Sequence, residues 1–144
     1  MKKILFVCKH NIFRSSVAEI LFKKMNKNKN YAASSAGLIE WHKKDLKKDQ
    51  GYIAEKKIMK KFGIKIKESS RGLNSSILKD TDIIVIVADD VPPSLFKKEK
   101  IFDGRVIIWK TKDVKAGDKN KGKIAEKSIK YIQKKVGQFV KSLK

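Results

Sequence analysis

The only cysteine of the 144-residue chain, Cys8, lies six residues before Arg14, one of three arginines. Ser15 follows Arg14 directly. A thiolate is a strong nucleophile, and a guanidinium offers a planar pair of donors to two phosphate oxygens. A serine hydroxyl beside the sulfur can donate a hydrogen bond to the thiolate when it forms and when it leaves. The spacing therefore predicts attack by Cys8 on a bound phosphate, with Arg14 and Ser15 as further catalytic residues.

The residues between Cys8 and Arg14 are predicted to bind the phosphate. An apolar run, residues 3–7, ends just before Cys8, and helical apolar spacing begins at Ser15. A loop between a strand end and a helix start collects free N–H groups, and the helix dipole adds positive potential. Both effects favour the thiolate form of Cys8. The predicted phosphate-binding residues are Lys9, His10, Asn11, Ile12, Phe13 and Arg14.

Four short apolar segments predict the strands that position this loop. Residues 3–7 and 82–88 are nearly continuous apolar runs, which is typical of strands buried on both faces of a parallel sheet. Residues 31–35 predict a shorter strand. Residues 106–109 predict a fourth strand, which we also expect to be buried.

Apolar residues at helical spacing between these segments predict amphipathic helices. The predicted stripes are Val17, Ala18, Leu21, Phe22 and Met25; Ile53, Ala54, Ile58 and Phe62; and Ile124, Ala125, Ile129, Ile132, Val136, Phe139, Val140 and Leu143. Asn74 is the expected N-cap of a short helix over residues 74–79. The alternation predicts an α/β fold: three layers, with a four-stranded parallel sheet between helices on both faces, and a site at the carboxyl ends of the strands.

Length and composition fit one globular domain over residues 1–144. A hydrophobic fraction of 41% excludes a wholly disordered chain. No apolar run approaches the roughly 20 residues of a membrane helix, and the start of the chain lacks the features of a signal peptide. We therefore expect a cytoplasmic protein with no membrane association. One cysteine and two histidines are too few for an ordinary structural zinc site, and we expect no metal or other cofactor.

The Cys8 loop and its flanks resemble the signature of the low-molecular-weight protein tyrosine phosphatases, in which Cys, five residues, Arg and Ser follow the first strand. The resemblance covers nearly the whole chain. Its segments are Phe6-Val7-Cys8, Arg14-Ser15-Ser16-Val17-Ala18-Glu19, Ser34-Ser35-Ala36-Gly37, Trp41-His42, Ser70-Arg71-Gly72-Leu73 and Ala88-Asp89. It implies that family's flavodoxin-like fold and a metal-independent phosphatase acting on phosphotyrosine or similar aryl phosphates.

The resemblance also implies a two-step mechanism. Cys8 attacks phosphorus to form a phosphocysteine while an aspartate protonates the leaving oxygen, and water then hydrolyses the intermediate with the same aspartate as base. In the family this aspartate lies in the loop after the fourth strand. Asp113 stands where the family has Asp-Pro and is the expected general acid, and Asp118 is the alternative. Asn11 matches the asparagine that keeps the family's loop in shape.

The expected substrate pocket includes Trp41 and His42, at the spacing of a Trp-His pair in the family, with Trp41 stacking on a phenyl ring. His10 replaces the family's usual loop glycine, and Val114 replaces proline. Ile12 stands where the family's arginine phosphatases carry threonine, which disfavours phosphoarginine. The expected partners are a phosphorylated protein or small aryl phosphate, and inorganic phosphate.

Two other functions stay open. Arsenate reductases share the fold and the thiolate loop, and with a single cysteine an external small thiol would have to supply the resolving sulfur. The net charge of +21 attracts polyanions, so a phosphate- or polyanion-binding module with little turnover is the third interpretation. The lysines are scattered and arginine is scarce, which favours a solvated surface with only non-specific polyanion binding.

Overall fold

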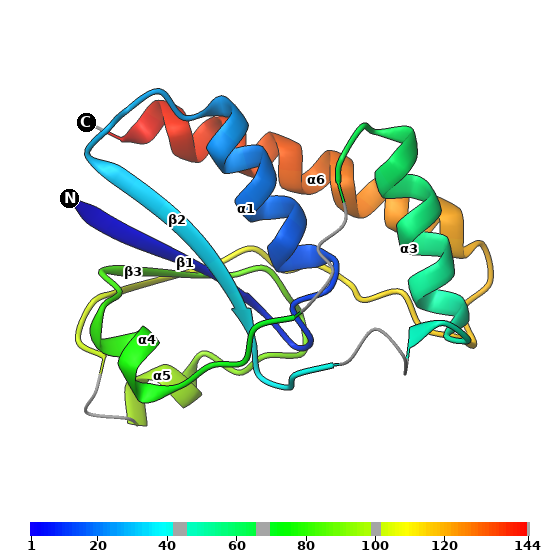
Figure 1. Cartoon of the computed structure of the whole chain (residues 1–144), viewed down its shortest axis with the longest axis horizontal. Coiled ribbons are helices and arrows are strands. Elements are labelled where there is room, and N and C mark those ends of the chain that lie inside the picture. Colours follow the sequence, from blue (N-terminus) through cyan, green and yellow to red (C-terminus); the bar gives the residue numbers. More distant parts are fainter. Residues whose placement is uncertain (42–45, 66–69, 99–101, 144) are drawn as a thin grey trace.

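The computed structural model describes residues 1–41, 46–65, 70–98 and 102–143. Its elements in chain order (Figure 1) are β1 (Lys2–Cys8), α1 (Arg14–Met25), β2 (Tyr31–Gly37), α3 (Gln50–Lys61), α4 (Ser75–Lys79), β3 (Ile83–Ile86), α5 (Ser94–Lys98), β4 (Arg105–Ile108) and α6 (Lys121–Ser142). The four predicted strands are present, and Asn74 caps α4 by accepting a hydrogen bond from Ile77 N. Within these ranges, no helix is both long and apolar enough to cross a membrane.

The four strands form one parallel sheet in the order β2-β1-β3-β4. Parallel neighbours need crossover connections, which the helices supply. β1 comes first in the chain and lies at the centre, with β2 on one side and β3 on the other. The connection after β1 runs outward to β2 and the connection after β3 runs outward to β4, so the two leave neighbouring strands in opposite directions. A crevice forms between them beyond the carboxyl ends of β1 and β3, where such sheets bind ligands.

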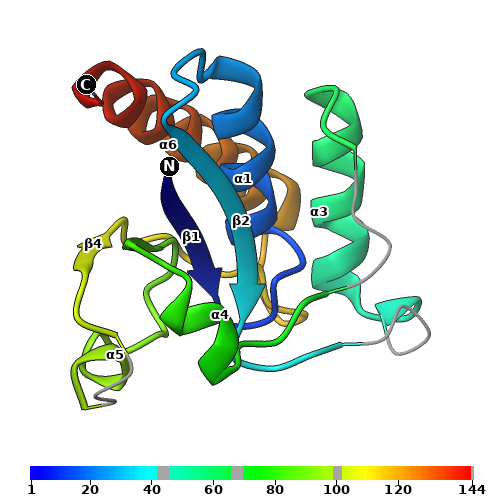
Figure 2. The same ribbon diagram turned by 60° about the vertical axis from the view of Figure 1, so that its left-hand side comes forward.

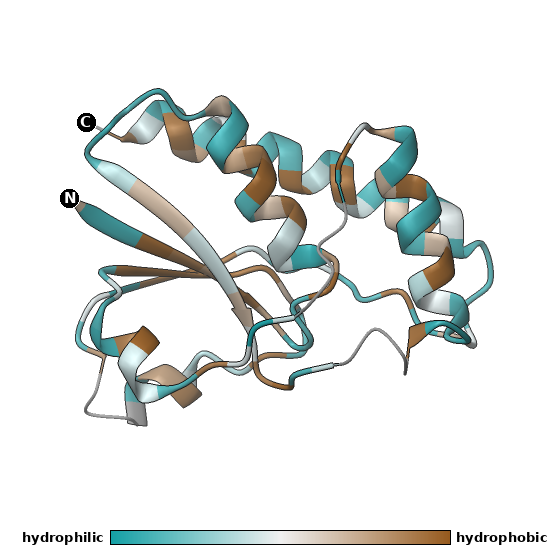
Figure 3. Cartoon of the chain, in the orientation of Figure 1, coloured by the Kyte–Doolittle hydropathy of each residue, from teal (hydrophilic) through white to brown (hydrophobic). Residues whose placement is uncertain are grey.

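Helices cover both faces of the sheet. α1, α3 and α6 lie on one face, and α4 and α5 lie on the other (Figures 1 and 2). Side chains alternate along β1, so Ile4 and Phe6 join the cluster that includes α1 and α6, while Leu5 and Val7 join the cluster that includes α4 and α5. Figure 3 shows β3 as hydrophobic along its length, whereas the helices mix both kinds of residue. The predicted three-layer α/β fold is confirmed.

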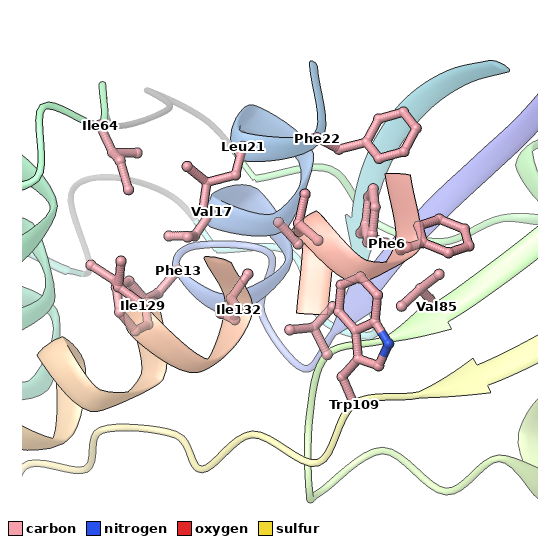
Figure 4. Close-up of a cluster of buried hydrophobic side chains, with 14 of the residues drawn as sticks. Phe6, Phe13, Val17, Leu21, Phe22, Ile64, Val85, Trp109, Ile129 and Ile132 are labelled. Atoms are coloured by element: carbon pink, nitrogen blue, oxygen red, sulfur yellow. The ribbon is translucent and has the colours of Figure 1, made fainter. Parts of the chain in front are cut away.

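Aromatic rings fill the larger core cluster behind the Cys8 loop. The Phe6 ring lies 5.8 Å from that of Phe22 and 5.7 Å from that of Trp109, measured between centroids. Figure 4 shows these rings beside residues of α6 such as Ile132. Phe13, which is 2% exposed, packs in the same cluster. Because Phe13 directly precedes the first residue of α1, this packing fixes the end of the loop.

Two expectations about burial are wrong. The segment 106–109 is not a buried strand throughout, since Ile108 is 46% exposed. β4 is an edge strand with a neighbour on one side only, which an apolar sequence does not reveal. The predicted apolar face of α3 is wrong in part: Ile58 and Phe62 pack against the core, but Ile53 is 43% exposed. Glu55 and Met59, which were not predicted, are buried. α3 contacts α6 and the loop before it through the side that carries Glu55 and Met59.

Candidate active site

The Cys8 loop, residues 8–14, joins the end of β1 to the start of α1. Four of its carbonyls accept hydrogen bonds from groups beyond the loop. These bonds run from Leu38 N to Cys8 O (3.2 Å), Ile39 N to Lys9 O (2.9 Å), Ser16 Oγ to Asn11 O (3.1 Å) and Val17 N to Phe13 O (2.8 Å). Of the loop's N–H groups, that of Asn11 points at the thiol and donates to Cys8 Sγ at 3.2 Å. This geometry suits an anion.

Asn11 holds the loop in its shape. Its φ of 55° lies in the left-handed region, which asparagine tolerates better than most residues. The buried side chain donates to Ser15 Oγ (2.8 Å) and Ser35 Oγ (2.9 Å), and it accepts from Arg71 N (2.9 Å). Ser35 donates in turn to Glu19 of α1. The left-handed residue is thus Asn11, and His10 replaces glycine without a positive φ.

The end of β2 approaches the Cys8 loop very closely. A Cβ atom at Gly37 would lie 2.7 Å from Asn11 N, so a larger residue would displace the loop. Gly37 N donates to Arg71 O (2.7 Å), and Gly37 O accepts from Leu73 N (2.9 Å). The segments 34–37 and 70–73, which carry part of the family resemblance, therefore lie side by side and support the loop.

The Cys8 thiol lies at the base of this loop and is 2% exposed. Its Sγ is 3.0 Å from Ser15 Oγ. Because Ser15 Oγ already accepts from Asn11 Nδ2, its own proton is free to point at the sulfur. Two donors, the Asn11 N–H and the Ser15 hydroxyl, are thus placed to stabilise a negative sulfur.

The Arg14 guanidinium is 2% exposed and held in a fixed orientation. One of its nitrogens, Nη1, donates to Thr111 O at 2.8 Å, and the other, Nη2, lies 3.1 Å from Asp90 Oδ1. Burial acts to lower the pKa of Arg14, but Cys8, Asp113 and Asp90 outweigh it and raise that pKa. The group therefore stays charged and is ready to bind an oxyanion beside Cys8.

A pocket of about 330 Å³ opens at the loop. Its wall combines the loop with residues from α3 and from the segments that follow β2, β3 and β4. The lining residues are Cys8, Lys9, His10, Ile12, Phe13, Arg14, Trp41, Leu46, Asp49, Tyr52, Glu55, Asp90, Asp113, Val114, Lys115 and Ala116. The volume fits a small organic group. In the described part of the chain, no cluster of three or more His, Cys, Asp or Glu side chains is placed to hold a metal ion.

The two aspartates considered as general acid differ in their surroundings. Asp113 lines the pocket, and its Oδ2 lies 3.8 Å from Arg14 Nη2. Asp118 is not among the lining residues. It accepts hydrogen bonds from Lys112 Nζ (2.7 Å) and from Lys115 N (2.8 Å), and these bonds lower the pKa of Asp118.

Trp41 lines the same pocket as Asp49 and Tyr52 at the start of α3. Its ring meets His10 edge-on, with 4.7 Å between centroids. Ser70 fixes the backbone of Trp41, because the Ser70 hydroxyl accepts from Trp41 N (2.7 Å) and donates to Trp41 O (3.0 Å). Burial lowers the pKa of His10, so the imidazole is neutral at pH 7. His42, predicted beside Trp41, lies outside the described residues.

Sequence reasoning missed several residues of the site. Asp90 and Thr111, the partners of Arg14, come shortly after the ends of β3 and β4. Their position was the available signal, because parallel strands gather functional groups at their carboxyl ends. Glu55, a further lining residue, lies four residues before the buried Met59 and shares its helix face.

Solved structures share the fold. An arsenate reductase from Archaeoglobus fulgidus is 27% identical, with a TM-score of 0.67 over 96% of this chain and 99% of that chain. The low molecular weight protein tyrosine phosphatase SP-PTP from Streptococcus pyogenes is 20% identical, with a TM-score of 0.71 over 100% of this chain and 94% of that chain. Vibrio vulnificus Wzb in complex with benzylphosphonate is 24% identical, with a TM-score of 0.70 over 99% of each chain. No curated protein sequence matches this chain.

A family profile also matches nearly the whole chain. Residues 3–144 match the profile described as low molecular weight phosphotyrosine protein phosphatase. The matched span includes the Cys8 loop, the supporting segments 34–37 and 70–73, and the loop that carries Asp113. Fold, site and profile agree, and the chain belongs to the low molecular weight phosphotyrosine protein phosphatase family.

Proposed function

We propose that this protein is a metal-independent phosphatase that hydrolyses phosphotyrosine or similar aryl phosphates through a phosphocysteine intermediate. One observation carries the proposal: the Cys8 sulfur accepts from Asn11 N–H and lies 3.0 Å from the Ser15 hydroxyl, at the base of a loop whose carbonyls are held outward. Arg14 lies at the end of the same loop. These groups serve a thiolate that attacks a bound phosphoryl group.

In the first step the Cys8 thiolate forms an S–P bond, and the bond from phosphorus to the leaving oxygen breaks. The loop N–H groups and Arg14 bind the equatorial oxygens, where negative charge is held in the transition state. Asp113, protonated, gives its proton to the leaving oxygen. Its place in the pocket wall and its 3.8 Å distance from Arg14 favour Asp113 over Asp118 for this role.

In the second step a water molecule attacks phosphorus, and the Asp113 carboxylate takes a proton from it. The S–P bond breaks, inorganic phosphate leaves, and Cys8 returns to the thiolate. The Ser15 hydroxyl donates to the sulfur as it leaves. Trp41 supplies an aromatic wall on which a phenyl leaving group can stack. We expect a single domain acting in the cytoplasm on a phosphorylated protein or small aryl phosphate.

Hydrolysis of para-nitrophenyl phosphate in the presence of a metal chelator tests this function. Wild type should turn over, and Cys8→Ser should be inactive. Asp113→Ala should lower kcat by about 10²- to 10⁴-fold, the usual contribution of a general acid. Asp118→Ala, in the same loop, is the matched control and should keep nearly full activity. Mass spectrometry after an acid quench should find phosphate on Cys8.

Each alternative outcome has a definite meaning. Inert wild type would refute the phosphatase proposal. A large loss in Asp118→Ala with normal Asp113→Ala would exchange their roles. If wild type turns over but phosphorylated Cys8 is found neither in wild type nor in the slower Asp113→Ala variant, the result would argue against the covalent intermediate.

Arsenate reduction is the second candidate, because the 27% identical Archaeoglobus fulgidus structure is titled an arsenate reductase. Cys8 would displace an oxygen of arsenate to form an S–As bond. A small external thiol would then form a disulfide with Cys8, arsenite would leave with the electron pair of the S–As bond, and a second external thiol would restore Cys8. Arsenite formation with glutathione, compared between wild type and Cys8→Ser, tests this activity.

A further inference from the structure

Glu55 of α3 is a buried carboxyl group in the pocket wall that the proposed mechanism does not use. It is 5% exposed and lines the pocket together with Arg14 and Asp113. Its Oε2 is the single buried side-chain oxygen or nitrogen without a hydrogen-bond partner among residues 1–41, 46–65, 70–98 and 102–143. Burying a polar atom without a partner costs about 1–3 kcal/mol, and native proteins rarely leave one so. Such an atom beside a ligand pocket points to a ligand that pairs with it.

The backbone around Glu55 holds the carboxyl in place. Gly51 lies one helical turn before Glu55, and a Cβ atom at Gly51 would lie 2.4 Å from Val114 O. The start of α3 therefore packs directly against the loop that carries Asp113. Asp49 caps the helix start by accepting from Tyr52 N at 2.9 Å. The start of α3 is therefore held against this loop on the side of the helix that carries Glu55.

The charges that face Glu55 indicate which partner fits. Burial raises the pKa of Glu55 well above its ordinary value, and Asp113 and Asp49 raise it further while Arg14 opposes them. Asp90 adds another carboxyl group to the lining, whereas Lys9 and Lys115 are its other cations. When Arg14 binds the phosphoryl group, most of the charged groups that remain to contact the leaving group are carboxyl groups. An N–H donor, above all a cationic one, is complementary to this wall, and an anionic substituent is not.

We propose that Glu55 is a specificity-determining residue that accepts a hydrogen bond from the leaving group, so that the pocket selects aryl phosphates whose ring carries an amine or another cationic N–H group. This inference rests on the proposed function, because it places the phosphoryl group in the Cys8 loop and the ring in the pocket. It adds the chemical class of the substituent that the pocket prefers.

Three matched substrates test the inference: phosphotyramine, with a cationic aminoethyl group; para-ethylphenyl phosphate, its neutral counterpart; and the phosphate of para-hydroxyphenylpropionic acid, with an anionic group. The readout is the ratio of kcat/KM for the amine to kcat/KM for the neutral ester. In Glu55→Leu this ratio should fall by about tenfold or more relative to wild type, as expected for a lost charge-assisted hydrogen bond. Glu55→Gln keeps an acceptor oxygen but cannot ionise when the cationic amine binds, and its ratio should fall by a smaller factor.

Glu126→Gln is the matched control, because it makes the same substitution but lies on α6 in ion pairs with Lys61 and Lys130. Its ratio should equal that of wild type. An unchanged ratio in both Glu55 variants, or an equal fall in Glu126→Gln, would overturn the inference. Glu55→Gln is nearly isosteric, so it decides the test if Glu55→Leu misfolds. Failure of wild type to hydrolyse the neutral ester would refute the proposed function itself, which is a separate result.

Discussion

At the scale of single residues, the site consists of polar side chains buried together and paired with one another. Asn11, Ser15 and Arg14 are each 2% exposed or less, and the hydrogen bonds described for them meet at the Cys8 loop. Residue types and spacing were enough to predict this trio with Cys8. Asp90 and Glu55 could not be predicted in the same way, since their roles depend on which segments fold against the loop.

Ser15→Ala should slow the release of Cys8 from the phosphocysteine, because the departing thiolate loses the donor 3.0 Å from its sulfur. We expect kcat to fall about 10- to 100-fold, equivalent to one hydrogen bond to a charged group. Rapid mixing with para-nitrophenyl phosphate should reveal a burst of nitrophenol before the slow steady state. Ser142→Ala, at the end of α6, should show wild-type rates. A Ser15→Ala enzyme without a burst and with normal kcat would contradict this role.

Glu55→Gln should stabilise the protein increasingly as the pH rises. Burial raises the pKa of Glu55 above its ordinary 4.5, so between these two pKa values the folded protein keeps a proton that the unfolded chain has lost. As the pH rises from about 4.5 to the folded-state pKa of Glu55, this group lowers the free energy of unfolding of the wild type. Above the folded-state pKa its contribution no longer changes with pH. The variant lacks this loss, so its stability advantage over wild type should grow across this pH range.

Thermal unfolding of both proteins from pH 4 to pH 8 measures this effect. Glu126→Gln, at a half-buried position on α6, should show no such trend against wild type. A constant difference in Tm between Glu55→Gln and wild type at every pH would show that Glu55 is ionised when buried.

At the scale of elements, apolar runs and helical spacing were sufficient to locate the strands and helices. They failed where burial depends on neighbours. β4 has the sequence of a buried strand but lies at the sheet edge, and α3 buries Glu55 in place of Ile53. A hydrophobic pattern records preferences of single residues, whereas the contact of α3 with the Asp113 loop decides which of its sides is covered.

Gly51→Ala tests whether α3 positions the general acid. The added methyl would meet Val114 O at 2.4 Å and displace the loop that carries Asp113. A misplacement of about 1 Å can cost roughly 10²-fold in rate, and we expect kcat for para-nitrophenyl phosphate to fall by at least about tenfold. In the Asp113→Ala background, Gly51→Ala should cause no further loss of kcat, because the displaced group is already gone.

Gly137→Ala is the control for the added methyl. Gly137 lies within α6, and apart from its own helix backbone and chain neighbours no heavy atom of the described residues would lie within 4 Å of an added Cβ atom. Alanine there should therefore stabilise the helix by about 0.5–1 kcal/mol and leave kcat unchanged. Equal losses of kcat from Gly51→Ala in both backgrounds would mean that α3 acts on a group other than Asp113.

At the scale of the whole molecule, charge is divided unevenly. The chain carries a net charge of +21, yet Asp49, Glu55, Asp90 and Asp113 line one pocket. The surrounding cations draw phosphate esters toward the molecule from a distance, while the carboxyl groups act at contact. Composition predicted the long-range field, but not the acidic pocket, because the four groups come from three separate segments of the chain.

Raising ionic strength from about 0.01 M to 0.15 M shortens the Debye length from about 30 Å to about 8 Å. The kcat/KM for para-nitrophenyl phosphate, a dianion, should fall several-fold over this range because long-range attraction is screened, while kcat at saturation stays constant. Sodium chloride and potassium glutamate at equal ionic strength should act alike. If only one salt inhibits, its anion competes for the Cys8 loop and screening is not the cause.

The central place of β1 governs the order in which the protein can be assembled. β1 is the first of the four strands to leave the ribosome, but the strands that pair with it end only at Gly37 and Ile86. The hydrogen bond of Arg14 cannot form until Thr111, 97 residues further on, has been made. The last helix, α6, packs over the same face as Ile4 and Phe6. A nascent chain therefore carries the apolar residues of β1 uncovered until α6 has been made, which exposes them to aggregation. During refolding, secondary structure should return first and phosphatase activity last.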